Sequence, residues 1–295
     1  MTLKLYFHPL ASYCHKVLIA LYEHDIAFEP ILVDLGDEKS SAAFRALWPL
    51  AKFPVLRDEA RNCTVAESTV IIEYLDAYRP TAAPFVPADG DLAWQTRMWD
   101  RFYDLYVQEL MQKIVGDRLR PAGRTDPFGV EQAVAQLGRS YAMIEAWMKS
   151  NSWAMGDAFT LADCAAAPAL FYANTITPLG SEHRSTRAYL DRLMARPSFA
   201  RVLEEAQPYF AMFPMERKPQ VSRLCGHLAG RRTRRGAAPS CTPGSLPSQV
   251  RRSATPPTAA APQLPTGRSW SSGCGALPRH RWQKRFRGKA LARRA

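Results

Sequence analysis

Ser12 and Cys14 lie where a strand-like apolar segment passes into a segment with helical spacing. Ser is a preferred N-cap residue, so helix capping alone would explain Ser12. The N-terminus of a helix also presents unpaired N–H groups and a partial positive charge, which stabilise an anion such as a thiolate. A hydroxyl there can donate a hydrogen bond to sulfur, and a thiol in the first turn would itself be acidified. A small Cys on a packed helix is, however, most often inert.

Two further motifs could hold the backbone and the charged end of a peptide-like ligand. Phe53-Pro54 precedes a short strand; with a cis bond, the backbone of Phe53 would face outward to meet an extended peptide, and a plain turn proline is the alternative. Glu67-Ser68 open a helical segment, where an acidic residue and a capping hydroxyl are common. If a ligand lies there, Ser68 can hold a carboxylate while Glu67 binds an ammonium group. An amino-acid head group carries both charges.

The spacing of apolar residues predicts the elements that position these motifs. The first 80 residues alternate strand-like and helix-like segments in the order βαβ then ββα, which is typical of the thioredoxin fold. A proline-rich linker follows from Arg79 to Asp91, and beyond it every periodic segment is helical. The expected helices cover residues 92–119, 130–148, 161–172, 187–194 and 199–206. Thr160 to Asp163 form a capping box, which we interpret as structural. We therefore expect an α/β thioredoxin-like N-terminal domain (1–80) followed by an all-α C-terminal domain (91–216).

The last 79 residues differ from the rest in charge and composition. The formal net charge is +12, yet residues 217–295 hold 18 Lys and Arg and no Asp or Glu, whereas residues 1–216 hold 21 basic and 27 acidic residues. The segment also holds nine of the 23 prolines. Such a sequence cannot bury enough apolar surface to offset its ordering entropy. We expect a disordered basic tail, either a genuine arm that binds nucleic acid non-specifically or the product of reading a GC-rich gene out of frame.

Cysteine usage and hydropathy bear on the compartment. Six cysteines are too few and too scattered for a disulfide framework, and no two of them form a CxxC pair. The N-terminal residues lack the pattern of a signal peptide, and no run approaches the roughly 20 apolar residues of a membrane span. These patterns predict a cytoplasmic protein without a membrane partner.

Taken together, the motifs resemble those of the cytosolic glutathione transferases from Leu3 to about Pro214. Each motif alone is weak, and the combination is specific. The residues that carry the resemblance are Ser12-x-Cys14, Lys52-Phe53-Pro54-Val55-Leu56, Glu67-Ser68 with Ile72-Glu73-Tyr74-Leu75-Asp76, and Gly156-Asp157-x-Phe159-Thr160-Leu161-Ala162-Asp163.

The resemblance implies a glutathione site in the first domain. Pro54 would be the cis-proline, and the backbone of Phe53 would pair with the cysteinyl unit of glutathione. Lys52 would hold the glycyl carboxylate, while Glu67 and Ser68 would hold the γ-glutamyl end.

The resemblance also implies an electrophile pocket in the helical domain, for which Tyr103 and Tyr106 are candidates, a homodimer, and no metal. Ser12 is the predicted hydroxyl that stabilises the thiolate of the co-substrate glutathione. Cys14 would instead imply mixed disulfides, and Tyr6 resembles the tyrosine position of other classes of the family.

Two departures from the family pattern lie in the loop that carries Lys52. Trp48 and Ala51 stand where the family usually has Asn and Gly, so we expect this loop to differ in position. The leading hypothesis is a transferase that conjugates glutathione to a small electrophile, as in detoxification. The alternatives are a glutathione-dependent thiol reductase or peroxidase, a non-catalytic scaffold with the same fold, and nucleic-acid binding through the tail.

Overall fold

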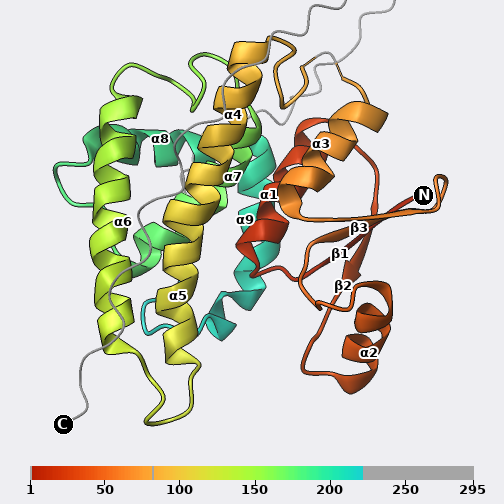
Figure 1. Cartoon of the computed structure of the whole chain (residues 1–295), viewed down its shortest axis with the longest axis horizontal. Helices are drawn as coiled ribbons and strands as arrows, with labels where there is room; N and C mark the ends of the chain where they lie inside the picture. The colour runs from red at the N-terminus through yellow and green to blue at the C-terminus, as the bar shows by residue number, and fades with distance from the viewer. Residues whose placement is uncertain (1, 82, 222–295) are drawn as a thin grey trace, which may run out of the picture. The chain divides into compact units, whose positions relative to one another are not determined.

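The computed structural model describes residues 2–81 and 83–221 (Figure 1). A sheet with three helices comes first, and the helices that follow form a second layer beside it. The elements of the first part are β1 (Leu3–Phe7), α1 (Ser12–Glu23), β2 (Glu29–Leu32), α2 (Glu38–Leu47), β3 (Val55–Asp58), β4 (Cys63–Ala66) and α3 (Ser68–Tyr78). The elements of the second part are α4 (Gly90–Tyr103), the π-helical turn η1 (Asp104–Gln108), α5 (Glu109–Arg118), α6 (Pro127–Met148), α7 (Leu161–Ile176), α8 (Arg184–Ala195), α9 (Pro197–Ala206) and the 3₁₀ turn η2 (Gln207–Met212).

The sheet has the strand order β2-β1-β3-β4, in which β1 pairs parallel with β2 and antiparallel with β3. Successive side chains of β1 point to opposite faces of the sheet. Leu3 and Leu5 are buried against α1 and α3, whereas Tyr6 packs with Phe44 of α2 on the other side. This arrangement confirms the expected thioredoxin-like α/β domain.

The helical domain surrounds α7, in which nearly every residue is buried. Helix α7 begins with the expected capping box, since the side chain of Thr160 and that of Asp163 each bond the other's backbone N–H. Asp163 is fully buried and also accepts hydrogen bonds from Ala154 N (2.8 Å) and Tyr189 Oη (2.6 Å). Burial raises the pKa of Asp163, although these donors oppose the shift. The structural interpretation of this motif is confirmed.

Two details differ from the sequence-based expectations. The helix expected over residues 92–119 is divided into α4, the π-helical turn η1 and α5. A π-helical turn adds one residue to the helix, which helical spacing of apolar residues does not predict. Contacts with the body continue past residue 216, the expected end of the helical domain: Lys218 Nζ donates to Phe213 O (2.5 Å), and Val221 packs against the core. The rest of the predicted tail, residues 222–295, and its nucleic-acid binding lie outside the described residues. In the described parts of the chain, no helix is both long and apolar enough to cross a membrane.

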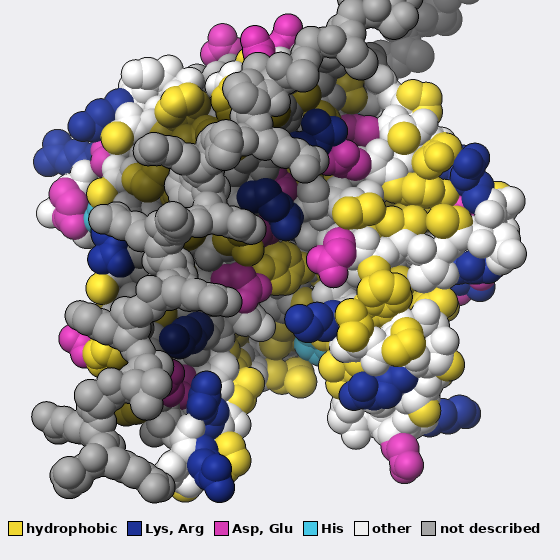
Figure 2. Space-filling view, viewed as in Figure 1, with side chains coloured by type: hydrophobic (Ala, Val, Ile, Leu, Met, Phe, Trp, Pro, Cys, Tyr) yellow, Lys and Arg dark blue, Asp and Glu magenta, His cyan; other side chains and the backbone are white. Residues whose placement is uncertain are grey.

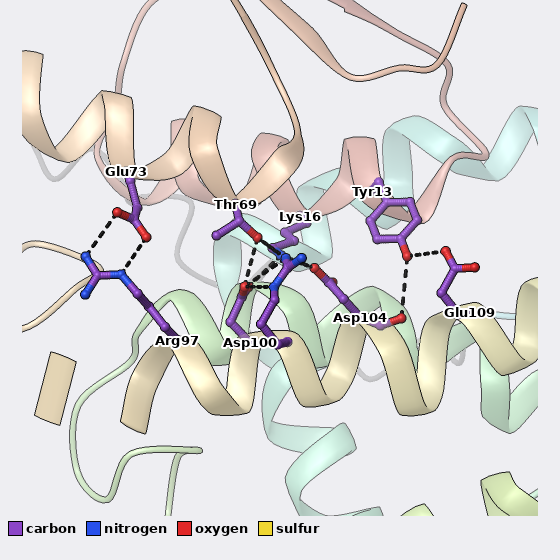
Figure 3. Close-up of polar contacts among 9 residues, drawn as sticks. Tyr13, Lys16, Thr69, Glu73, Arg97, Asp100, Asp104 and Glu109 are labelled. Atoms are coloured by element: carbon purple, nitrogen blue, oxygen red, sulfur yellow. Dashed lines mark hydrogen bonds and ion pairs between the residues drawn. The ribbon is translucent and has the colours of Figure 1, made fainter. Parts of the chain in front are cut away.

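A buried ion network joins the two domains beneath the pocket described below (Figure 3). The ammonium of Lys16 in α1 lies 2.5 Å from Asp100 Oδ1 and 2.8 Å from Asp104 Oδ2, and it donates to Thr69 Oγ1 of α3 at 2.9 Å. Lys16 is 1% exposed and Asp100 is fully buried. Arg101 donates to both carboxylates and to Thr69. The network therefore ties α1 and α3 to the helix α4 and its π-helical turn.

We expect Lys16→Met to lower the free energy of unfolding by roughly 3–5 kcal/mol, because it leaves two buried carboxylates without this cation. The matched control is Arg97→Met, which breaks an exposed pair between α4 and Glu73 of α3 (2.7 Å) and should cost less than about 1 kcal/mol. Urea unfolding followed by circular dichroism measures both. Equal losses in the two variants would contradict a special role for the buried network.

His15 is another buried titratable group of α1. It is fully buried between Tyr172 and Phe199, and its Nε2 lies 2.5 Å from Pro9 O. Burial lowers the pKa of His15 to about 4. Because the unfolded chain binds this proton near pH 6.5, the unfolded state holds more protons at lower pH. The contribution of His15 is therefore complete above pH 6.5 and is lost as the pH falls toward 4.

We expect His15→Gln, whose amide can still donate to Pro9 O, to reduce the loss of stability between pH 6.5 and 4.5 by about 2 kcal/mol relative to wild type. Urea unfolding at each pH gives the two curves. Above pH 7 they should run parallel, because His15 is neutral in both states. Curves that stay parallel down to pH 4.5 would show that His15 does not set the acid sensitivity.

Candidate functional site

A pocket of about 200 Å³ lies between the loops of the thioredoxin-like domain and the helices α4 and α5. The residues that line it are Tyr13, Trp48, Lys52, Phe53, Pro54, Glu67, Ser68, Arg101, Asp104, Leu105 and Glu109. Figure 2 shows a hollow between the side of the molecule that carries α2 and the side that carries α5, with acidic and basic side chains on its rim. All five residues that the resemblance assigned to glutathione binding line this pocket.

The loop between α2 and β3 forms one wall. The Phe53-Pro54 bond is cis, as expected, and the side chain of Lys52 is exposed at the pocket. Ala51 adopts φ = +51°, a left-handed conformation that favours Gly. The loop thus keeps a conformation suited to the family's Gly although the residue is Ala. Trp48, the other departure from the family pattern, lines the pocket.

The turn between β4 and α3 forms the adjoining wall. Glu67 has φ = +69°, a left-handed conformation that is costly for a residue with a side chain. Ser68 is the first residue of α3, where backbone N–H groups have no partner within the helix. A carboxylate is favoured at such a helix end, and the exposed side chain of Glu67 supplies a negative charge beside it. This geometry suits an amino-acid head group.

The three predicted thiol-activating residues do not line the pocket. Ser12 is 6% exposed, and Ala11, not Ser12, occupies the N-cap of α1, so the capping interpretation is wrong. Cys14 is fully buried, and burial raises the pKa of its thiol. Both features disfavour a reactive thiolate at Cys14. Tyr6 packs on Phe44 in the small cluster under α2.

The two tyrosines proposed for an electrophile pocket lie elsewhere. Tyr103 is fully buried in the core, where its ring contacts Trp99 and Phe102. Tyr106 is 47% exposed and lies outside the lining of the pocket. Both positions speak against that assignment, because Tyr103 is taken up by the core and Tyr106 is exposed away from the pocket lining.

Five residues that line the pocket were not predicted as site residues from the sequence: Tyr13, Arg101, Asp104, Leu105 and Glu109. Tyr13 lies between Ser12 and Cys14 in the sequence. Its side chain lines the pocket, whereas theirs are buried. Glu109 follows Asp104 by five residues, which in an α-helix places it about 140° round the axis. In η1 the N–H of Glu109 bonds to Asp104 O, so the π-helical turn returns Glu109 to the same face. Arg101 and Asp104, three residues apart and therefore on one helix face, were the sequence pattern that could have indicated a polar surface here.

In the described residues no group of three or more His, Cys, Asp or Glu side chains could hold a metal ion.

Comparison with known proteins follows the same division into two domains. Residues 5–83 match the glutathione S-transferase N-terminal domain, and residues 103–197 match the glutathione S-transferase C-terminal domain. Glutathione S-transferase 3 of Zea mays is 30% identical over 215 residues, covering 68% of this chain and 93% of the relative. A stringent starvation protein A homolog of Haemophilus ducreyi is 27% identical over 202 residues, covering 68% and 89%.

Among solved structures, a glutathione S-transferase from Methylobacillus flagellatus with GSH bound is 26% identical, with a TM-score of 0.62. The match covers 68% of this chain and 98% of that one. Sequence, fold and domain order agree across these comparisons, and the chain belongs to the glutathione S-transferase family.

Proposed function

We propose that the protein binds glutathione in this pocket and transfers its thiolate to a small electrophile. The observation that carries the proposal is the meeting of Lys52, the cis Phe53-Pro54 bond and the Glu67-Ser68 turn at one pocket. The similar Methylobacillus flagellatus protein, whose structure holds GSH, supports glutathione as the ligand.

Each charged end of glutathione has a complementary group in this arrangement. Lys52 binds the glycyl carboxylate, and the backbone of Phe53 pairs with the cysteinyl unit. The N-terminus of α3 with Ser68 holds the γ-glutamyl carboxylate, and Glu67 binds the ammonium group. Proximity and ionisation of the sulfur are then the main requirements for conjugation.

The N-terminus of α1 is the group we propose for stabilising the thiolate. Tyr13 in its first turn lines the pocket, and unpaired N–H groups with a partial positive charge lie at this helix end. Ser12 is not among the residues that line the pocket. In this proposal the backbone N–H groups of α1 therefore take the role expected of the Ser12 hydroxyl.

We expect Ser68→Ala and Glu67→Gln each to weaken glutathione binding by about 5- to 150-fold, or 1–3 kcal/mol, because each removes a charge-assisted hydrogen bond. Isothermal titration calorimetry on the full chain measures the affinity. Ser150→Ala and Glu131→Gln, at exposed positions away from the pocket, are the matched controls. Unchanged affinity in both pocket variants would move the glutathione site elsewhere.

A second candidate is a protein that binds glutathione without turnover. It is favoured by one observation: Ser12, Cys14 and Tyr6 all lie outside the pocket lining. The buried thiol of Cys14 also removes support from the alternative of a reductase that works through this residue. A panel of conjugation and peroxidase assays separates these functions, since glutathione binding without activity in any assay would identify a binding protein.

For the transferase we expect Ser12→Ala to change turnover less than about threefold, because its hydroxyl does not line the pocket. Conjugation kinetics and glutathione affinity are measured together on the variant. A tenfold or greater loss of turnover at unchanged affinity would restore Ser12 as the donor to the thiolate.

We further propose a cytoplasmic homodimer. Exposed apolar side chains gather on the neighbouring helices α3 and α4, which the Arg97–Glu73 pair holds together. They are Val70, Trp94 and Met98, each about half exposed. A second copy that covers this face would remove them from water.

A further inference from the structure

The wall of the pocket opposite the glutathione-binding loops is mainly polar. It consists of Tyr13 from α1 and of Arg101, Asp104, Leu105 and Glu109 from α4, η1 and α5. Only Leu105 is an aliphatic side chain. A second substrate beside the glutathione sulfur has to contact this wall, so its charges decide which substrates fit.

Most of the charge on this wall is already compensated. Arg101 donates to Asp100 Oδ2 at 3.0 Å and to Asp104, and Lys16 lies within 2.8 Å of both carboxylates. Two cations thus face two carboxylates. This group contributes no net charge to the pocket.

Glu109 differs from these residues in having no cationic partner. Tyr13 Oη donates to Glu109 Oε1 at 2.8 Å (Figure 3). No Lys, Arg or His nitrogen in the described segments forms an ion pair with Glu109, and the nearby Arg101 pairs with Asp100 and Asp104 instead. Burial raises the pKa of Tyr13, so its hydroxyl stays protonated and donates. A hydroxyl orients a carboxylate without neutralising it, and Oε2 keeps its capacity to accept hydrogen bonds.

We propose that the second substrate carries a cationic group, such as an ammonium, which pairs with Glu109 when the electrophilic carbon lies at the glutathione sulfur. The inference rests on the proposed function, since it names the substrate class of the same pocket. Glu109 is exposed, so it is hydrated in the free pocket. An apolar group against it would remove water from an unpaired carboxylate, whereas a cation replaces that water with an ion pair. Glu109 is then a specificity-determining residue, and Tyr13 is a positioning residue that orients it.

The cationic group takes no part in bond making. The thiol proton goes to solvent, the sulfur forms a bond to the electrophilic carbon, and the leaving group departs with the electron pair of the bond that breaks. Selectivity can therefore be measured on product-like ligands without any turnover.

The test uses three glutathione derivatives with side chains of similar length: S-(5-aminopentyl)glutathione, S-hexylglutathione and S-(4-carboxybutyl)glutathione. On the full chain, calorimetry should show the amino derivative binding roughly two- to fivefold more tightly than the hexyl derivative, and the carboxyl derivative binding most weakly. Glu109→Gln should abolish the preference, and Tyr13→Phe should reduce it. Glu131→Gln on the exposed surface of α6 is the control and should retain it. Added salt should weaken the preference.

The outcomes separate this inference from the proposed function. If glutathione itself does not bind, the proposed function fails and the inference fails with it. If glutathione binds, equal affinities of the amino and hexyl derivatives in the wild type would overturn the inference alone. A preference that survives Glu109→Gln would overturn it as well.

Discussion

The ammonium group of Lys16 is the constraint on which the meeting of the two domains depends. A buried cation costs several kcal/mol unless charged and polar partners surround it, and here they come from three elements. Asp100 and Asp104 lie one turn apart in the helical domain, and Thr69 lies in α3 of the thioredoxin-like domain. Satisfying Lys16 therefore fixes α1, α3 and α4 relative to one another.

The same arrangement of helices positions the residues that line the pocket. Tyr13 lies one turn before Lys16 on α1, and Ser68 directly precedes Thr69 in α3. Asp104 belongs to the network and to the pocket lining at once. A shift of any helix that left Lys16 unpaired would also displace the groups that we propose for binding glutathione. We infer that the network serves the position of the site more than net stability, since buried ion pairs stabilise folds weakly.

The sequence predicts the parts of the structure that depend on local pattern. The alternation of strands and helices, the capping box at Thr160 and the loop motif Phe53-Pro54 all follow from period, propensity and short spacing. Period and propensity do not predict which side chains of a helix's first turn face a pocket. Preference for Ser at an N-cap favoured Ser12, yet Ala11 holds that position and Tyr13 turns to the pocket. The π-helical turn after Tyr103 has no signature in the apolar pattern, so the position of Glu109 could not be predicted either.

The two walls of the pocket differ in what they leave for a ligand. On the wall of loops, Lys52, Glu67 and the N-terminus of α3 each offer a charge or dipole that one end of glutathione can neutralise. On the helical wall, the network neutralises itself and Glu109 remains, held by a neutral hydroxyl. Glu109 owes its place to one extra residue in η1, without which an α-helical register would turn it away from Asp104. A local change in backbone geometry thus sets the charge of the wall that faces the groups we propose for binding glutathione, and those groups lie on other elements.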